Sequence, residues 1–346
     1  MKYIYVISSD IDGPGGQALV TRQVIKLLNL QTKNVKIIDL KARNGYSIFA
    51  FFACLFLIIR KYKISTIYFT PTRNLAAILK DLPIYILSMT GVRVVGHIHG
   101  NDISKIFQAK FIGKILLYFY QKKIITIIPS KYLAKKYLVE YNIKCDVIEN
   151  FIPEEIYKKL HTSKAKAHLN IVWNSNLILS KGALDFLKCM QSILPEITKY
   201  NISVNIFGRI IENNKSFLIR RNLDNLRNIN ISYHGEVSRE ETFAYMNEKS
   251  IVFLLSRSEC QPLALIDAMM AGCYIVVYDY PEMIDLLNNY SKCIFMSKEN
   301  KETEKTVKLI IEKIRTDIKD YETGHEYSRF QEANFNKKIK FILNAN

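Results

Sequence analysis

The chain has 346 residues, of which 49% are hydrophobic and 23% are charged, a balance typical of a packed globular protein rather than a disordered one. Lys and Arg together number 49 against 32 Asp and Glu, which gives a formal net charge of +17. Such an excess favours anionic partners, namely nucleic acid, anionic lipid or a nucleotide diphosphate; a lysine-rich surface without such a role is the alternative. The length is sufficient for two domains that each bury a core.

The six cysteines form no C-x-x-C pair and have no metal-ligand spacing, which favours free thiols in a reducing cytoplasm. An apolar strand begins at residue 2, so we expect no secretory signal in this sequence. The longest apolar run, residues 48–59, is shorter than the ~20 residues that a membrane-spanning helix needs. We interpret this run as a buried helix, with a helix that dips into a membrane surface as the alternative.

A glycine-rich loop follows the first predicted strand, residues 2–8, and leads into a helix. Its Gly15 and Gly16 allow the backbone to approach a ligand closely, and the N-terminus of the helix favours an anion. A tight turn without a ligand is the alternative. The spacing is not G-x-G-x-x-G, so a dinucleotide fingerprint fits poorly.

Further strands are predicted at residues 35–40, 66–70 and 92–95, and the last of them leads into GHIHGND. His97 and His99 are two residues apart on an extended segment and therefore point to the same side. No third ligand of the right kind follows, so we do not expect a zinc site. A histidine bonded to backbone at a strand end is the alternative to a functional His99.

Residues 105–123 are predicted to form a basic, aromatic, amphipathic helix. Such a helix suits contact with anionic lipid, although an ordinary surface helix also has an apolar stripe. The residues expected to contact the membrane are Lys105, Phe107, Lys110, Phe111 and Lys114.

The second half begins after a polar, lysine-rich segment at residues 158–168, which we interpret as a linker. A strand at 169–173 leads into a loop that contains Asn176 and Lys181. Arg209 follows a later strand. A solvated loop lysine is the alternative for Lys181.

Residues 250–285 have the pattern of one βαβ unit, with strands at 251–255 and 274–278. The loop after the first strand contains Glu259, and the helix contains Asp267 eight positions later. Ligands of open α/β sheets bind at the carboxyl ends of the strands, so the two acids are placed to reach different parts of one elongated ligand. A loop acid that caps the following helix is the alternative for Glu259.

This stretch resembles the signature of retaining glycosyltransferases of family 4, written loosely as S-x-x-E-x7-E-A-x-A-x-G. The matching residues are Ser256, Glu259, Asp267, Ala268, Met270 and Gly272. The second acid is Asp where the family usually has Glu. Lys181-Gly182 resembles the family's K-G pair, and Gly15-Gly16 resembles its first glycine pair, whereas Asn176 stands where the family has Arg. The resemblance covers nearly the whole chain.

The resemblance implies a GT-B fold, which consists of two Rossmann-like parallel-sheet domains that face each other across a cleft. We expect an acceptor-side domain at residues 1–160 and a nucleotide-sugar domain at 161–325. Residues 326–346 are expected to form a C-terminal helix that crosses back to the first domain.

The resemblance also implies roles for single residues. Lys181 would stabilise the leaving diphosphate, Glu259 would bind the sugar hydroxyls, and His99 would lie on the acceptor side. Asp267 would bind the ribose, and Arg209 or Arg257 would compensate in part for the charge that Asn176 lacks. The remaining donor-binding positions are Gly15, Gly16 and the backbone of Gln261, Pro262 and Leu263. Enzymes of this kind need no metal or cofactor, and they favour front-face attack.

We therefore expect a hexose or N-acetylhexosamine to pass from a nucleotide-diphosphate sugar to a glycan or lipid-linked acceptor. The expected setting is bacterial capsule, O-antigen or lipopolysaccharide synthesis in the cytoplasm, at the inner face of the plasma membrane. A catalytically impaired relative or a nucleotide-sugar epimerase is one alternative, which Asn176 favours. A non-enzymatic polyanion-binding protein is another, but no nucleic-acid-binding motif is present in the sequence, and we expect no nucleic-acid partner.

Overall fold

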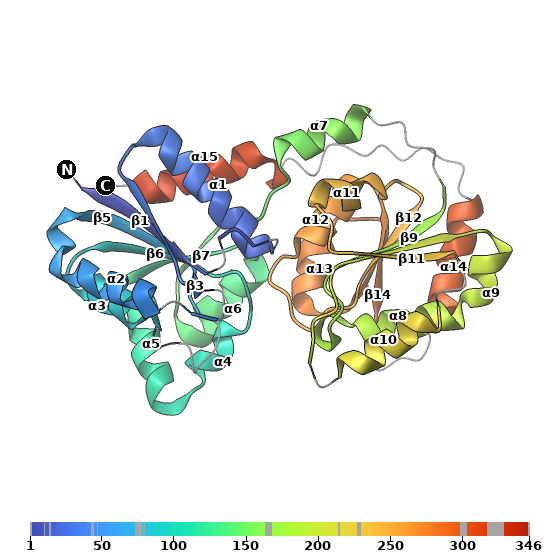
Figure 1. The fold of residues 1–346 in the computed structure, drawn as a ribbon, viewed down its shortest axis with the longest axis horizontal. Helices are drawn as coiled ribbons and strands as arrows, with labels where there is room; N and C mark the ends of the chain where they lie inside the picture. Colours follow the sequence, from blue (N-terminus) through green and yellow to red (C-terminus); the bar gives the residue numbers. More distant parts are fainter. Residues whose placement is uncertain are drawn as a thin grey trace. The chain divides into compact units, whose positions relative to one another are not determined.

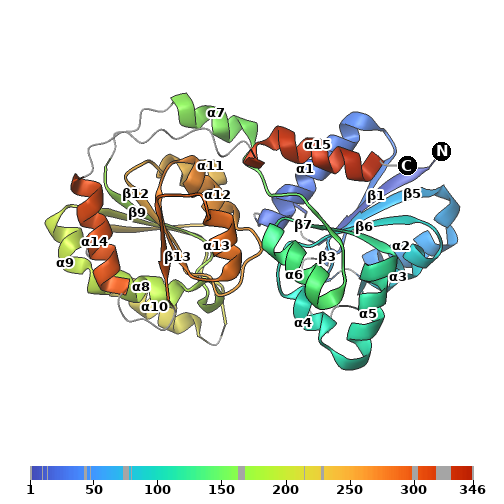
Figure 2. The same cartoon turned by 180° about the vertical axis from the view of Figure 1, so that it is seen from behind.

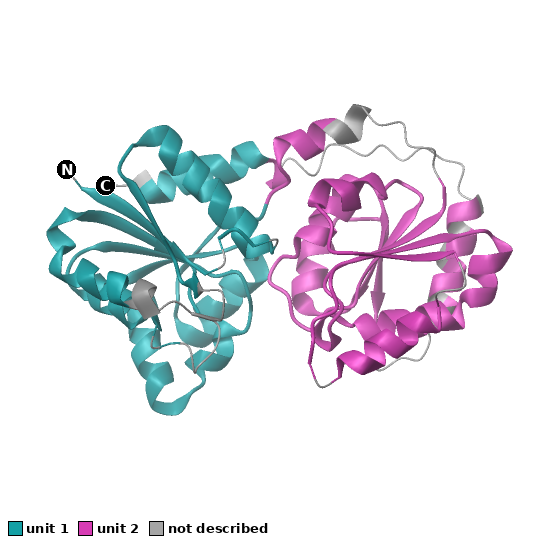
Figure 3. Cartoon of the chain, in the orientation of Figure 1, with its two compact units in different colours: residues 1–150, 332–346 teal, residues 151–331 magenta. Residues whose placement is uncertain are grey.

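The computed structural model describes residues 2–9, 11–13, 15–42, 45–46, 48–72, 78, 80–162, 168–213, 215–226, 230–297, 303–316 and 329–344. The chain divides into two compact units (Figure 3). Unit 1 comprises Met1–Asn150 and Glu332–Asn346, and unit 2 comprises Phe151–Gln331. Each unit is built around a six-stranded sheet whose strand pairs are all parallel, which confirms the predicted α/β class.

The sheet of unit 1 has the strand order β2-β1-β5-β6-β7-β8. Its strands are β1 (Tyr3–Ser8), β2 (Val35–Asp39), β5 (Ile64–Phe69), β6 (Arg93–His97), β7 (Ile124–Ile128) and β8 (Cys145–Val147). A separate antiparallel pair is formed by β3 (Lys41–Ala42) and β4 (Gly45–Tyr46). The chain runs outward from β1 to β2 and then returns to β5 on the other side of β1. This reversal makes the β1/β5 boundary the switch point of the sheet, where ligands of such folds bind.

Two helices cover one side of this sheet, α1 (Gly16–Gln31) and α15 (Glu332–Asn344) (Figures 1 and 2). Gln23 of α1 donates to Glu332 over 2.7 Å, and the Arg93 guanidinium donates to the Ile342 carbonyl over 2.7 Å. These contacts hold the last helix on unit 1, so the expected helix that crosses back is confirmed. The other side carries α2 (Ile48–Ile59), α3 (Leu82–Met89), α5 (Lys110–Lys122) and α6 (Lys131–Tyr141).

Helix α2 differs from the prediction of a buried helix. It buries Cys54 and Leu57, but it exposes Phe52, Phe56 and Ile59 by 59%, 48% and 75%. A helix in the outer layer of a sheet domain can bury only the side that faces its neighbours, whatever residues it carries on the other side. The continuous apolar run therefore concealed an exposed apolar stripe.

The predicted helix at 105–123 is two helices, α4 (Ile103–Phe107) and α5. The chain changes direction between them, at residues 108–109. Gly113 of α5 then packs closely against the end of α4, where a Cβ atom would lie 2.3 Å from the Phe107 carbonyl oxygen. Phe107 is only 4% exposed, and its ring contacts Tyr120, Tyr137 and Tyr141. The prediction that Phe107 contacts a membrane is therefore wrong, because the break in the helix turns this ring into the core.

The sheet of unit 2 has the strand order β11-β10-β9-β12-β13-β14. Its strands are β9 (Asn170–Asn174), β10 (Ser203–Phe207), β11 (Ile231–Gly235), β12 (Ser250–Leu254), β13 (Tyr274–Tyr278) and β14 (Cys293–Met296). Its helices are α7 (Glu154–Thr162), α8 (Ala183–Ser192), α9 (Leu194–Lys199), α10 (Ser216–Asp224), α11 (Arg239–Ala244), α12 (Leu263–Met270), α13 (Pro281–Leu287) and α14 (Thr303–Thr316). The predicted linker begins inside α7, and its residues 163–167 lie outside the described residues.

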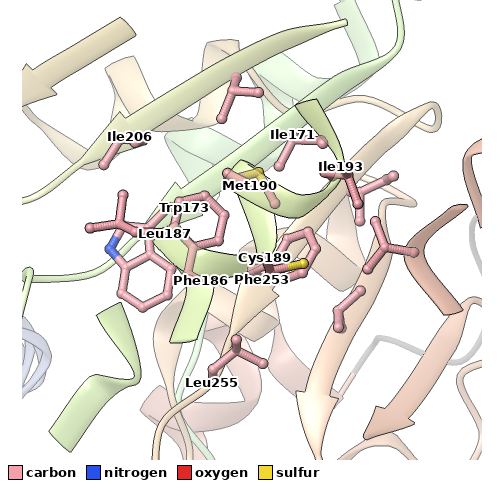
Figure 4. Close-up of a cluster of buried hydrophobic side chains, with 14 of the residues drawn as sticks. Ile171, Trp173, Phe186, Leu187, Cys189, Met190, Ile193, Ile206, Phe253 and Leu255 are labelled. Atoms are coloured by element: carbon pink, nitrogen blue, oxygen red, sulfur yellow. The ribbon is translucent and has the colours of Figure 1, made fainter. Parts of the chain in front are cut away.

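Helix α8 packs on the sheet of unit 2 through an aromatic core (Figure 4). The Trp173 and Phe186 rings lie 4.9 Å apart, and the Phe186 and Phe253 rings lie 5.4 Å apart. The Trp173 indole N–H also donates to the Ser175 carbonyl over 2.7 Å. The buried tryptophan thus fixes the start of the loop that follows β9.

Candidate functional site

The switch point of unit 2 lies between β9 and β12, because the chain runs outward from β9 to β11 and then returns to β12. The loops after these two strands carry Lys181 and Glu259, and the Lys181 ammonium forms an ion pair with the Glu259 carboxylate. The Arg257 N–H also donates to the Ser180 carbonyl over 2.9 Å, which joins the two loops through their backbones. The structure therefore brings the predicted cation and acid together at the edge of the sheet where ligands of open α/β folds generally bind.

Gly182 allows these loops to come together. Its φ is +77°, which favours glycine, and it follows the short 3₁₀ helix η3 (Leu179–Lys181). A Cβ atom at this position would lie 2.1 Å from the Leu255 carbonyl oxygen. Any other residue would therefore push the Lys181 loop away from the end of β12.

The N-terminus of α12 follows directly after the Glu259 loop. Pro262 is its N-cap residue and provides no side-chain hydrogen bond, and α12 begins at Leu263. The first N–H groups of a helix have no partner within the helix and carry a partial positive charge, so this end suits an anionic or hydroxylated ligand. Gln261 lies in the same loop, and its side chain is buried.

Asp267 lies on α12 and is 1% exposed. The Arg239 Nε donates to both carboxylate oxygens over 3.1 and 2.8 Å, and the Arg239 Nη2 donates to Oδ1 over 2.6 Å. The same Nη2 donates to the Phe151 carbonyl over 3.3 Å. Both oxygens of Asp267 thus accept hydrogen bonds from Arg239, and the carboxylate is almost fully buried, so the predicted ribose contact would require this side chain to become accessible.

Asn176 lies beside Arg209 at the carboxyl ends of β9 and β10. The Arg209 N–H donates to the Asn176 side-chain oxygen over 3.3 Å, and the Leu177 N–H donates to the Arg209 carbonyl over 2.9 Å. Gly208, with φ +107°, permits this contact, because a Cβ atom there would lie 2.2 Å from the Ser175 carbonyl oxygen. The Arg209 side chain is half-exposed, and its guanidinium is 3.9 Å from Glu236.

Two polar groups near the site were not predicted as site residues. Arg239 opens α11, and nothing in its sequence spacing from Asp267 indicates that the two pair. Asp185 of α8 accepts a hydrogen bond from the Tyr278 hydroxyl over 3.0 Å and lies 3.7 Å from the Arg257 guanidinium. Burial, together with the Asp185 charge, raises the pKa of Tyr278.

The predicted residues of unit 1 lie near the carboxyl ends of its strands. Gly15 is the N-cap residue of α1 and Gly16 is its first residue, and no side chain caps this helix. Arg22 holds the preceding loop by donating to the Ile11 and Gly13 carbonyls over 2.7 and 2.8 Å. This glycine pair is therefore presented at the β1/β5 switch point of unit 1.

His97 and His99 lie at and just after the end of β6, and their rings are 4.1 Å apart. His97 is fully buried, and its Nδ1 is 2.7 Å from the Tyr68 hydroxyl. Burial and the neighbouring His99 hold the pKa of His97 well below its ordinary value. Among the described residues, no group of three or more His, Cys, Asp or Glu side chains is arranged to hold a metal ion.

The predicted membrane residues divide between α4 and α5. Lys105 pairs with Asp102 over 3.0 Å, whereas Lys110, Phe111 and Lys114 are exposed on α5. In the part of the chain that the structure describes, no helix is both long enough and apolar enough to cross a bilayer.

Comparison with known proteins identifies the family and the fold. The model of the family "Glycosyl transferases group 1" matches residues 161–343. A glycosyltransferase from Rickettsia africae ESF-5 is 14% identical, with a TM-score of 0.66 over 100% of this chain and 97% of that chain. Anabaena Alr3699/HepE in complex with UDP is 12% identical, with a TM-score of 0.64 over 100% and 95%. The lipopolysaccharide outer core galactosyltransferase WaaB is 12% identical, with a TM-score of 0.62 over 100% and 99%. No curated protein sequence matches this chain.

Proposed function

Because the chain belongs to the glycosyl transferases group 1 family and has the GT-B fold predicted from its sequence, we propose that it is a retaining glycosyltransferase that uses a nucleotide-diphosphate sugar. The observation that carries this proposal is the Lys181–Glu259 ion pair at the switch point of unit 2, beside the uncapped N-terminus of α12. It places a cation, a carboxylate and helix N–H groups at one edge of one sheet. These groups match the parts of a sugar diphosphate.

In the free protein, Glu259 neutralises Lys181. A bound diphosphate supplies a stronger anionic partner for the lysine, which leaves the carboxylate available to accept hydrogen bonds from sugar hydroxyls. As the bond between the anomeric carbon and the phosphate oxygen breaks, negative charge grows on the diphosphate. Lys181 and the first N–H groups of α12 stabilise that charge.

The acceptor oxygen then bonds to the anomeric carbon on the face that the diphosphate leaves, and the departing phosphate oxygen takes the acceptor proton. The configuration at the anomeric carbon is retained. The protein contributes position and charge and forms no covalent intermediate, so we propose that the reaction needs neither a metal nor a cofactor. Gly15 and Gly16 would lie beside the donor phosphates, and His99 would serve the acceptor.

Arg209 takes the place of the missing arginine in this proposal. Its backbone is hydrogen-bonded to Asn176, and its half-exposed guanidinium lies 3.9 Å from the Glu236 carboxylate. An arginine can donate two parallel hydrogen bonds to a phosphate, whereas the Asn176 amide brings no charge. The charge would thus come from the end of β10 rather than from the loop after β9.

Two relatives support the substrate class. The Anabaena structure contains UDP, and WaaB is a galactosyltransferase of the lipopolysaccharide outer core. We therefore propose a hexose or N-acetylhexosamine donor and a glycan or lipid-linked acceptor in bacterial surface polysaccharide synthesis. The proposed location is the cytoplasm, at the inner face of the plasma membrane.

A catalytically impaired relative that binds the nucleotide without transfer is the second candidate. Asn176 lacks the expected charge, and both oxygens of Asp267 are held by Arg239, which favours this reading. Nucleotide binding with no transfer to any acceptor would distinguish it from an active transferase.

The test is a thermal-shift screen of UDP-, GDP- and ADP-sugars, followed by transfer assays on lipid-linked acceptors with and without a chelator. We expect one nucleotide to raise the melting temperature of the wild type and to lose this effect in Lys181→Ala and Glu259→Gln. Lys188→Ala, which changes an exposed lysine on α8, is the matched control and should respond as the wild type does. Equal stabilisation of all four proteins would overturn the donor-site assignment.

A further inference from the structure

Helices α2, α3 and α5 lie next to one another on the same side of the unit 1 sheet (Figures 1 and 2). Helix α2 packs against α3. The Tyr85 ring of α3 lies 5.2 Å from the Phe119 ring of α5. We call the outward surface of these three helices the three-helix face.

Each of the three helices exposes an apolar stripe at positions i, i+4 and i+7. The stripe of α2 is formed by Phe52, Phe56 and Ile59. On α3, Ile86 and Met89 continue a stripe that begins at Leu82, and on α5 the stripe runs from Phe111 through Ile115 to Tyr118. The solvent side of an outer helix is normally polar, so three adjacent apolar stripes form a surface of the kind that marks a docking site.

The charges around this surface have one sign. Residues 48–63, 80–93 and 110–123, which contain the three helices and their ends, include only one acidic residue, Asp81. Asp81 is fully buried, and its carboxylate accepts hydrogen bonds from Thr72. Arg60, Lys110 and Lys114 by contrast are exposed, and the Arg60 guanidinium lies over the Phe56 ring at 4.7 Å. The face therefore presents apolar and cationic groups and no exposed carboxylate from these segments.

We propose that the three-helix face docks onto the surface of a lipid bilayer that contains anionic phospholipid. Aromatic and aliphatic side chains would enter the boundary between head groups and acyl chains, while lysine and arginine side chains reach the phosphates. The face is wider than the predicted helix at 105–123, because α2 and α3 each add an exposed apolar stripe to that of α5. The proposal does not depend on the transfer reaction proposed above.

Both components of the face contribute to membrane affinity. Each lysine near an anionic surface contributes ~1 kcal/mol to binding, which raises the partition coefficient about fivefold. Removal of a phenylalanine ring from the interface lowers the partition coefficient by about tenfold, because the apolar area of the ring is no longer buried in the membrane. Binding should consequently weaken when salt is added and persist in part, because only the charge contribution is screened.

The apolar component is tested by vesicle flotation of the full-length protein with phosphatidylcholine alone and with phosphatidylcholine plus phosphatidylglycerol. Phe111→Ser should lower binding to the anionic vesicles by about tenfold. Phe341→Ser is the matched control, because Phe341 is 75% exposed on α15 and Phe111 is 76% exposed on α5. Equal binding of the two variants, or wild-type binding that does not depend on phosphatidylglycerol, would overturn the proposal.

The charge component is tested by the pair Lys110→Glu and Lys114→Glu. The control pair Lys337→Glu and Lys340→Glu makes the same change in net charge on α15, on the other side of the same sheet. We expect the first pair to abolish flotation with anionic vesicles and the second to leave most of it intact. Equal losses in both pairs would show that net charge alone draws the protein to the vesicle, and the proposed face would then be wrong.

A single tryptophan reports which face is inserted. Trp173 is the one native tryptophan, and it is buried in unit 2. The emission of Phe111→Trp should shift to the blue with anionic vesicles and be quenched by brominated lipid, whereas Phe341→Trp should not respond. If sedimentation instead shows a dimer of the wild type that Phe111→Ser converts to monomer, and vesicles leave the Phe111→Trp spectrum unchanged, the face joins two copies of the chain and the proposal fails.

Discussion

Replacing Asp267 by asparagine removes one charge from a buried ion pair. The Asp267 side chain is 2% exposed and that of Arg239 is 13% exposed, and three hydrogen bonds of 2.6 to 3.1 Å join them. Breaking such a pair by changing one partner reduces stability by ~3–5 kcal/mol, since the other charge is left buried. We expect a loss of stability at the lower end of this range, because Arg239 keeps its contact with the Phe151 carbonyl and some exposure to water.

A loss of about 3 kcal/mol corresponds to a melting temperature about 6–12 °C lower for a unit of this size. Differential scanning calorimetry of the free protein measures this decrease in melting temperature. Glu240→Gln, which changes an exposed acid on α11, is the control. The double variant Arg239→Met with Asp267→Leu should recover much of the loss, because it leaves no unpaired charge. An unchanged melting temperature in Asp267→Asn, together with weaker nucleotide binding, would refute the structural role and favour a ribose contact.

Three further predictions concern other positions. Gly182→Ala should weaken donor binding by tenfold or more in calorimetric titration, because its Cβ atom would meet the Leu255 carbonyl and move Lys181; unchanged affinity would contradict this. Arg209→Asn should weaken donor binding by about tenfold, and adding Asn176→Arg should restore it if the charge has moved between these positions. Burial raises the pKa of Asp81 from 3.8 to about 7, so the folded state binds the proton more tightly and stability should fall by about 3 kcal/mol between pH 5 and pH 8. Asp81→Asn should remove that part of the pH dependence.

Most of the strands and the loop that carries Glu259 were predictable because their signals are local. Apolar runs separated by polar loops predicted most strands of both sheets, although not the edge strands β8 and β14. The spacing around Glu259 placed it in a loop between a strand and a helix. The resemblance to family 4 glycosyltransferases also implied that Lys181 and Glu259 share a site. Their direct pairing depends on the Gly182 backbone and was not predicted.

What could not be predicted depends on tertiary packing. An apolar run such as residues 48–59 carries no period that separates a buried side from an exposed one, so the α2 stripe was missed. Phe107 has helical spacing with Phe111, but the change of direction before α5 turns it into the core. Arg239 and Asp267 are 28 residues apart on separate helices, and only the packed fold shows that they pair.

The most direct test of the donor site is a crystal structure of the protein with the nucleoside diphosphate that the thermal-shift screen selects. We predict that the diphosphate lies within hydrogen-bonding distance of the Lys181 Nζ and the first N–H groups of α12, with Glu259 separated from Lys181. A diphosphate bound elsewhere, or a Lys181–Glu259 pair that stays intact beside the bound nucleotide, would contradict the assignment.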